Sequence, residues 1–316
     1  MNALDPQQQT LGLFAGIGVV LLVASVIGHV LKVSVARHQP HGVIDNLNAR
    51  IKAWWVMVAV SAVAFLFGRV GVTLLFLFVS CVALAEYMAG LSSRNGTSPA
   101  LTAGCVIVLP VQYLLIYHGA HALYAIFVPM CAFLVLPIAL AAAGAKGELA
   151  ARAGRMQWGL IICVYCISYV PALLTLDIPG YEGRDLLLIV FLVLVVQSSD
   201  VLQYVWGMLI GQRKLAPVVS PSKTWEGLIG GVASATALGS ALYWITPFAP
   251  WQAAVMALAI NTLGFLGGLM MSAIKRGRGV KDWGRLIEGH GGMLDRLDSL
   301  ILAAPVFYCV TRYGWT

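Results

Sequence analysis

Charged side chains are scarce in this sequence. Only 10% of its 316 residues are Asp, Glu, Lys or Arg, whereas 60% are hydrophobic, and the mean hydropathy is +0.86. A soluble domain carries about 25% charged residues. The low charge content therefore excludes an ordinary soluble globular protein and predicts an integral membrane protein.

The features of a signal peptide and of a redox motif are also missing. The stretch MNALDPQQQT at the start has no Lys or Arg, and the apolar run after it reaches about Val35, too long for a signal-peptide core. We therefore expect a retained first span. The six cysteines lie in or at the ends of apolar runs, including the CxxC of Cys163 and Cys166, and are predicted to act as small hydrophobic residues.

Acidic residues are the less frequent charge. Thirteen Asp and Glu stand against 20 Lys and Arg, which gives a formal net charge of +7. In a membrane protein such an excess is typical of cytosolic loops beside anionic lipid. We therefore expect the lipid bilayer as a partner and no nucleic acid.

Long apolar runs are abundant, and a membrane-spanning helix needs roughly 20 apolar residues. They predict an all-α polytopic membrane protein with about ten transmembrane helices in a single integral membrane domain, 1–316. Residues 1–156 would form N-terminal membrane helices, and 157–316 a membrane region with the longest polar loops. The predicted spans are 10–35, 53–68, 71–90, 101–117, 120–144, 157–176, 186–210, 227–246, 251–273 and 297–314.

The distribution of cations orients these spans. If the sides alternate, all Lys and Arg except Arg69, Arg184 and Arg312 fall on one side with their flanking loops. Cytosolic loops carry such an excess of positive charge. We therefore expect the N and C termini on the non-cytosolic side, and loops 211–226 and 274–296 in the cytosol.

The loop 274–296 and its flanks read SAIKRGRGVKDWGRLIEGHGGMLDRLDSL. Its glycines allow the backbone to approach a ligand closely, and cations beside glycines favour a polyphosphate site. An ordinary positive loop beside anionic lipid is the alternative. The cations before the final acids are Lys275, Arg276, Arg278, Lys281 and Arg285.

Three acids near apolar runs could hold a metal ion. Asp295 and Asp298 are three residues apart, so they share a face if the last helix has begun. Asp200 lies within an apolar span, where an ionisable residue is a functional hypothesis by default. Carboxylates beside phosphate-binding cations suggest Mg²⁺. The alternatives are helix capping by Asp295 or Asp298, and a structural polar cluster around Asp200.

The loop 211–226 is basic and contains two prolines. Lys223 is one of its cations, and Ser222 or Thr224 could cap the following helix, with Glu226 in the first turn. A rigid basic loop before a helix N-terminus is a phosphate site. Another acid, Glu86, ends an earlier span and is interpreted as a snorkelling or helix-paired carboxylate.

These two loops resemble the CDP-diacylglycerol synthase family, the membrane phosphatidate cytidylyltransferases. The resemblance extends over about 197–305. The residues that match the family motif in the last loop are Ser272, Lys275, Arg276, Lys281, Asp282, Gly284, His290, Gly291, Gly292, Asp295, Arg296 and Asp298. Those that match in the preceding loop are Lys214, Pro217, Ser220, Pro221, Lys223, Thr224 and Gly227.

Two positions depart from the family pattern. Asp200 stands in SSDVLQYVWG rather than in the usual D-[ST]-G-A-Y context, which is more similar to a paralogous branch. Gly268 stands where family members usually carry an Asp implicated in metal binding. Gly264 and Gly268 also form a GxxxG pattern, which favours helix packing.

The resemblance implies a reaction of CTP with phosphatidate that gives CDP-diacylglycerol and pyrophosphate, catalysed by region 157–316 at the cytosolic face of a bacterial inner membrane. It implies Mg²⁺ on Asp295, Asp200 and Asp298, with Lys275 and Arg296 in catalysis; a homodimer is one candidate assembly. A catalytically weakened paralog with a binding or regulatory role, and a transporter of a phosphorylated solute, are the alternatives. The implied substrate-binding residues are Ser220, Lys223, Thr224, Arg276, Lys281, Asp282, His290, Gly291 and Gly292.

Overall fold

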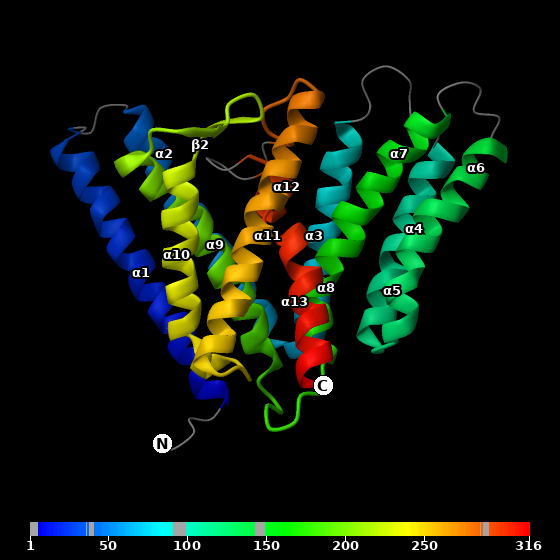
Figure 1. Ribbon diagram of the computed structural model, residues 1–316, viewed down its shortest axis with the longest axis horizontal. Coiled ribbons are helices and arrows are strands. Elements are labelled where there is room, and N and C mark those ends of the chain that lie inside the picture. The colour runs from blue at the N-terminus through cyan, green and yellow to red at the C-terminus, as the bar shows by residue number, and fades with distance from the viewer. Residues whose placement is uncertain are drawn as a thin grey trace.

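The computed structural model describes residues 6–35, 37, 41–90, 99–142, 149–284, 286 and 291–316. Almost all of them are helical, and the helices run side by side in one bundle (Figure 1). The first part contains α1 (Pro6–Ser34), α2 (Gly42–Leu66), α3 (Gly68–Ala89), α4 (Pro99–Tyr117), and the continuous run of α5 (His121–Met130), a π-helix (Cys131–Val135) and α6 (Leu136–Ala142).

The second part begins with another interrupted run, made of α7 (Leu149–Leu160), a π-helix (Ile161–Cys166), α8 (Ile167–Ala172) and a 3-10 turn (Leu173–Thr175). It continues with α9 (Asp185–Ile210), β1 (Lys214–Ala216), β2 (Ser220–Thr224), α10 (Trp225–Ala241), a 3-10 turn (Tyr243–Ile245), α11 (Pro250–Gly277), α12 (Leu294–Leu297) and α13 (Leu300–Trp315).

The prediction of a polytopic all-α membrane fold is confirmed. Seven helical segments among the described residues are long and apolar enough to cross a membrane. The other three predicted spans coincide with α4, α10 and α13, which have 19, 17 and 16 residues. The start of α1 and the end of α13 lie at the same end of the bundle (Figure 1). Which side of the membrane that end faces stays a prediction.

Two local features differ from the prediction. Helix α2 begins at Gly42 rather than near residue 53, because His41 caps it by accepting the Ile44 N–H. Its polar first turns are also tied to α1 by an ion pair of 2.6 Å between Lys32 Nζ and Asp45 Oδ1. The loop 211–226 contains a small antiparallel hairpin in which Ala216 lies opposite Ser220. The fold is therefore helical with one short β-hairpin at its polar end.

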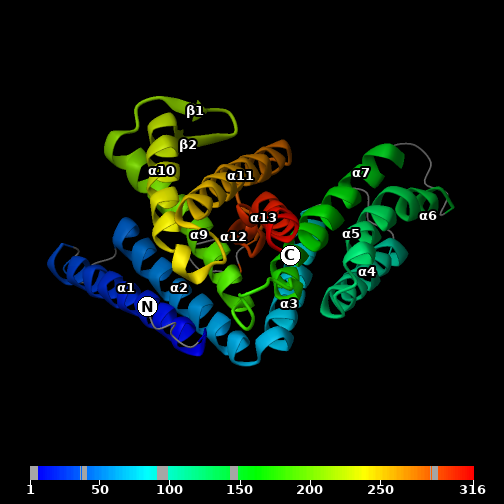
Figure 2. The same cartoon turned by 60° about the horizontal axis from the view of Figure 1, so that its bottom comes forward.

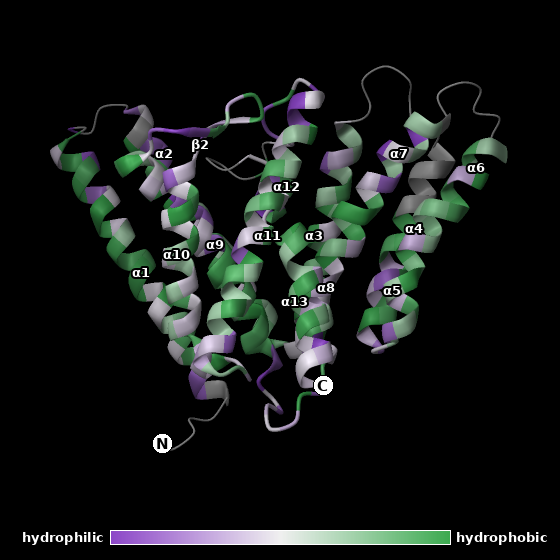
Figure 3. Ribbon diagram, viewed as in Figure 1, coloured by the Kyte–Doolittle hydropathy of each residue, from purple (hydrophilic) through white to green (hydrophobic). Residues whose placement is uncertain are grey.

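The centre of the bundle is α9. The first half of this helix is largely buried, and Leu187, Phe191 and Val195 are completely so. Helices α10, α11 and α13 pack against it, whereas α1 and α2 lie on one flank and α4 to α6 on the other (Figure 2). Hydrophilic residues gather on the hairpin and at the last turns of α11, while the middles of the helices are mostly hydrophobic (Figure 3). The polar end carries the loops in which the site was predicted.

Helices α9 and α10 pack closely through a glycine. A Cβ atom at Gly231 would lie 2.6 Å from Gln203 Cα, so only glycine permits this approach. Close contact through small residues is how helices associate in a membrane, where lipid is as apolar as the side chains.

We expect Gly231→Ala to destabilise the protein by about 1–3 kcal/mol, because the added methyl group forces α10 away from α9. The measurement is the thermal unfolding midpoint in detergent. Gly18→Ala on α1 is the matched control, since a Cβ there meets nothing within 4 Å. Equal midpoints for the two variants would contradict the close packing of α9 on α10.

Candidate functional site

A pair of carboxylates from two distant segments forms the centre of the site. Ser299 Oγ donates to Asp200 Oδ2 at 2.6 Å and lies 3.3 Å from Asp298 Oδ1. The Ser299 backbone N–H also donates to Asp298 Oδ1 at 2.8 Å. Ser299 is only 2% exposed. One buried hydroxyl thus joins Asp200 on α9 to Asp298 at the α12–α13 junction.

The sequence pointed to both carboxylates but not to Ser299. A serine next to an aspartate is common at helix starts, so nothing in the sequence singles it out. Only the approach of α13 to α9 gives this hydroxyl its second carboxylate.

Glycines on α11 admit the α12–α13 junction. A Cβ at Gly267 would lie 2.5 Å from the Asp298 carbonyl oxygen, and one at Gly264 would lie 3.2 Å from the Ser299 carbonyl oxygen. Gly264 therefore has the packing role predicted for it, and the segment it packs against is the α12–α13 junction, which carries Asp298 and Ser299. Any larger residue at Gly267 would push Asp298 away from α11 and from Asp200.

Lys223 of the hairpin provides positive charge beside the two carboxylates. It interacts electrostatically with Asp200 and Asp298. Burial lowers the pKa of Lys223 from its usual range, and the two carboxylates oppose that shift. Its Nζ also lies 4.5 Å from the centre of the Phe265 ring, a cation–π contact. The loop lysine predicted to bind phosphate is therefore held next to the acids.

Gly268 borders the same spot. A Cβ there would lie 3.3 Å from Lys223 Nζ and 3.8 Å from Asp298 Oδ2. The position at which an acid was expected thus faces the centre of the site. In this chain Lys223 lies beside the space that a side chain would otherwise occupy.

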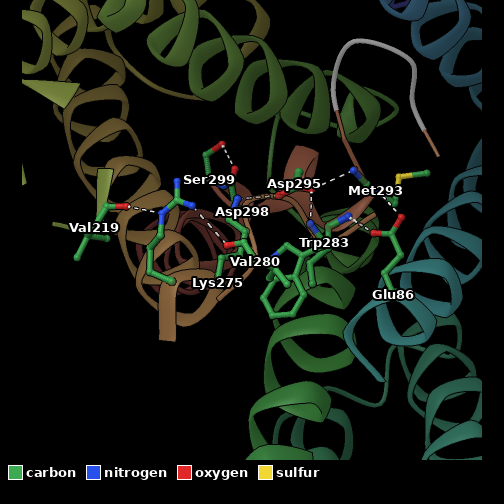
Figure 4. Close-up of polar contacts among 12 residues, drawn as sticks. Glu86, Val219, Lys275, Val280, Trp283, Met293, Asp295, Asp298 and Ser299 are labelled. Atoms are coloured by element: carbon green, nitrogen blue, oxygen red, sulfur yellow. Dashed lines mark hydrogen bonds and ion pairs between the residues drawn. The ribbon is translucent and has the colours of Figure 1, made fainter. Parts of the chain in front are cut away.

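Asp295 has a different environment from the other two acids. Its Oδ1 accepts from Lys275 Nζ at 2.7 Å, and its Oδ2 accepts from the backbone N–H groups of Trp283 at 2.8 Å and Gly292 at 2.9 Å (Figure 4). Asp295 is 5% exposed. It therefore holds the loop after α11 against α12, and binding a metal ion would require it to share these contacts. Its metal role stays a prediction.

Arg296 adds a second cation near the carboxylate pair. It interacts electrostatically with Asp200, and its backbone carbonyl accepts from Gln197 Nε2 at 3.3 Å. Its Nε is buried without a hydrogen-bond partner among the described residues. Neither Arg296 nor Lys223 forms an ion pair with a carboxylate of those residues. Both cations thus lie near carboxylates of the site without a direct ion pair to them.

The other predicted residues of the hairpin side have structural contacts. Thr224 accepts the Gly227 N–H at 3.1 Å and caps α10, so the cap predicted for Ser222 or Thr224 belongs to Thr224. Ser220 pairs with Ala216 in the hairpin. Arg276 donates to the carbonyl oxygens of Val219 and Val280, each at 3.4 Å, and so joins the hairpin to the end of α11.

The remaining predicted residues lie in the loop before α12. Lys281 and Asp282 are exposed. Gly291 has a φ of +85°, which favours glycine, and Gly292 contacts Asp295 through its N–H. The prediction for His290 falls outside the described residues.

One site contact makes an interpretation from the sequence specific. Glu86 on α3, interpreted as a snorkelling or helix-paired carboxylate, pairs with the start of helix α12 and forms no ion pair with a cation of the described residues. Its Oε1 accepts the Met293 N–H and its Oε2 the Leu294 N–H, both at 2.9 Å. A residue of the N-terminal half therefore contacts the start of α12 directly. The intervening sequence is too long for any spacing pattern to reveal this contact.

A magnesium ion has a characteristic ligand requirement, which the residues of the site can meet only in part. No group of three or more His, Cys, Asp or Glu residues is arranged around a common metal position in the part of the chain that the structure describes. Mg²⁺ is usually bound by one or two carboxylates together with substrate phosphates and water. Two carboxylates that share one hydroxyl near cations fit that requirement.

The chain was also compared with known proteins. The model of the cytidylyltransferase family matches residues 48–313, which is most of the chain. The chain belongs to the cytidylyltransferase family. It is therefore a nucleotidyltransferase embedded in a membrane, and the site lies within the matched region.

Individual relatives divide into two kinds. "Uncharacterized protein YnbB" of Escherichia coli is 37% identical over 272 residues, which cover 85% of this chain and 88% of that protein. "Phosphatidate cytidylyltransferase" of Brucella abortus is 46% identical over 131 residues, which cover 41% of this chain and 48% of that enzyme. The enzyme of the same name from Staphylococcus saprophyticus is 40% identical over 130 residues, 40% of this chain and 50% of that enzyme. The chain thus matches about half the length of each of these two enzymes.

We expect Lys275→Met to destabilise the protein by about 3–5 kcal/mol, because it leaves the Asp295 carboxylate buried without its cation. The side chains of this pair are only 12% and 4% exposed. The free energy of unfolding in a mild denaturant series is the measurement. Lys32→Met is the control: it breaks the more exposed pair with Asp45 and should cost much less. Equal losses would show that the Asp295 pair is not buried in solution.

Proposed function

We propose that this protein is a CTP:phosphatidate cytidylyltransferase that forms CDP-diacylglycerol and pyrophosphate for phospholipid synthesis. The observation that carries the proposal is the arrangement of Asp200, Ser299 and Asp298 beside Lys223 at the polar end of an apolar bundle. This arrangement suits an anionic, phosphate-bearing substrate that must meet a lipid. The names of the Brucella and Staphylococcus relatives point to the same reaction.

The proposed reaction transfers a cytidylyl group in one step. An oxygen of the lipid phosphate attacks the α-phosphorus of CTP, and the bond from that phosphorus to the oxygen bridging to the β-phosphate breaks, so pyrophosphate leaves. No covalent intermediate with the protein is needed, and catalysis depends on positioning and on neutralising phosphate charge. Lys223 and Arg296 would bind the phosphate oxygens, since both lie at the carboxylate pair and neither forms a direct ion pair with a carboxylate of the described residues.

Asp200 and Asp298 would hold Mg²⁺, with Asp295 as a further predicted ligand. When bound, the ion would neutralise charge on the α-phosphoryl group and on the leaving pyrophosphate. Ser299 would keep the two carboxylates at a fixed separation through its hydroxyl. Lys275 would act indirectly, by holding Asp295 in the loop.

The outer surface of α9 supports a lipid substrate. Val201, which follows Asp200 directly, is 52% exposed, and Tyr204 one turn later is 60% exposed. These side chains lie on an apolar helix, so they would face acyl chains. A lipid headgroup could reach Asp200 laterally from the bilayer, while the nucleotide approaches from the loops. The positive-inside pattern supports a cytosolic position for those loops, in an inner membrane.

We expect the purified protein to convert radiolabelled CTP and phosphatidate to CDP-diacylglycerol in the presence of Mg²⁺. Asp200→Asn and Asp298→Asn should each lower kcat at least about 100-fold. Each removes a negative charge that would hold Mg²⁺ against the substrate phosphates. Asp177→Asn, an exposed acid beyond the 3-10 turn at Leu173–Thr175, is the control and should leave kcat unchanged. An active protein whose Asp298→Asn variant is equally active would contradict the assigned site.

The alternative of a weakened family member is favoured by one observation, the glycine at position 268. The test is Gly268→Asp, with Gly268→Ala to separate the added bulk from the added charge. We expect no gain in kcat, since the new carboxylate would lie near Lys223 and draw it away from phosphate. A gain of about tenfold or more with Asp and not with Ala would show that a ligand is missing and would support the alternative; tenfold corresponds to about 1.4 kcal/mol.

A further inference from the structure

The last turn of α3 contacts the loop before α12 and the start of α12 itself. The two carboxylate oxygens of Glu86 each accept one backbone N–H, from Met293 and from Leu294, both at 2.9 Å (Figure 4). These two groups are at the start of α12, where N–H groups have no partner within the helix.

Glycines on both sides of the loop make this approach possible. A Cβ at Gly284 would lie 2.6 Å from Glu86 Oε1, and one at Gly292 would lie 2.5 Å from Oε2. Side chains at either position would displace the carboxylate. We call Glu86, Gly284, Gly292, Met293 and Leu294 the Glu86 clamp.

The aromatic ring next to Glu86 binds the same loop. The rings of Tyr87 and Trp283 have centres 5.3 Å apart, and the guanidinium carbon of Arg278 lies 4.4 Å from the centre of the Tyr87 ring. Tyr87 itself is fixed by donating its hydroxyl to the carbonyl oxygen of Arg155 on α7 at 3.0 Å. The end of α3 therefore contacts the beginning of this loop, at Arg278 and Trp283, and its end, at Met293 and Leu294.

The position of α12 determines where the acids of the site lie. Asp295 is its second residue and Asp298 follows its last residue. Asp295 accepts the backbone N–H groups of Trp283 and Gly292 in the loop. Glu86 accepts those of Met293 and Leu294 at the helix start. No cation of the described residues pairs with Glu86, so its charge is directed at the two backbone N–H groups. Hydrogen bonds to an ionised acceptor are about twice as strong as neutral ones.

We propose that Glu86 is a positioning residue: by fixing the start of α12 it sets Asp295 and Asp298 relative to Asp200. The catalytic consequence rests on the proposed cytidylyltransferase function, whereas the contact itself does not. The N-terminal half of the chain would thus supply part of the active-site framework. A displacement of about 1 Å in a catalytic group can cost 100-fold in rate.

The test compares Glu86→Gln with the unmodified full-length protein in detergent. The amide keeps the size but has one acceptor oxygen, so one of the two N–H groups would face an NH₂ group. Hydrogen–deuterium exchange should become at least about tenfold faster at Met293 and Leu294. In the assay with CTP and phosphatidate, kcat should fall at least about tenfold while KM for CTP changes less than about twofold.

Glu182→Gln is the matched control. Glu182 is also a carboxylate that accepts a backbone N–H, from Gly180 at 3.0 Å, but it lies in the loop before α9, at the opposite end of that helix from the hairpin. It should change neither exchange at α12 nor kcat. Comparable thermal midpoints of the two variants would confirm that the effects are not due to general unfolding.

The outcomes separate the two hypotheses. Unchanged exchange at Met293 and Leu294 in Glu86→Gln would overturn the Glu86 clamp. Faster exchange with unchanged kcat in an active protein would overturn its positioning role. If the unmodified protein made no CDP-diacylglycerol, the proposed function would fail, while faster exchange in Glu86→Gln would still support the contact.

Discussion

Two carboxylates sharing one hydroxyl inside an apolar bundle are the arrangement on which the other features of the site depend. Burying one charge is costly, and placing two like charges near each other adds repulsion. Asp200 and Asp298 can remain so only if donors and cations surround them. Ser299, Lys223 and Arg296 meet that need in part. The formal charges of Asp200, Asp298, Lys223 and Arg296 cancel, so a divalent cation would have to enter together with an anionic substrate.

Glycine on α11 and in the loop makes this arrangement sterically possible. At Gly267 the backbone of the α12–α13 junction comes closer than any side chain would allow, and at Gly284 and Gly292 a carboxylate takes the place of a Cβ. The same residue type therefore has two functions here. On α11, glycine allows the Asp298 carbonyl oxygen to lie against the helix. In the loop, glycine leaves room for the Glu86 carboxylate.

The residues around the carboxylate pair differ from the family pattern given above. Gly268 lies where a third acid was expected, and Lys223 lies next to that space. Asp295 is committed to Lys275 and to two backbone N–H groups. The chain is 37% identical to "Uncharacterized protein YnbB" over most of both chains, whereas it matches two phosphatidate cytidylyltransferases only in part. These similarities are consistent with a branch within the family. Such a branch would retain the carboxylate pair while the neighbouring charges differ.

The sequence by itself determined the membrane class and the approximate positions of the apolar helices, except for the start of α2. Apolar run length and loop charge are local properties, and the motif residues are read directly from the chain. Only the tertiary structure decided which acids meet. Ser299 joins Asp200 to Asp298, and Glu86 reaches Met293, across separations of 99 and 207 residues. Helix packing determines such contacts, and no local pattern records which faces of distant helices will touch.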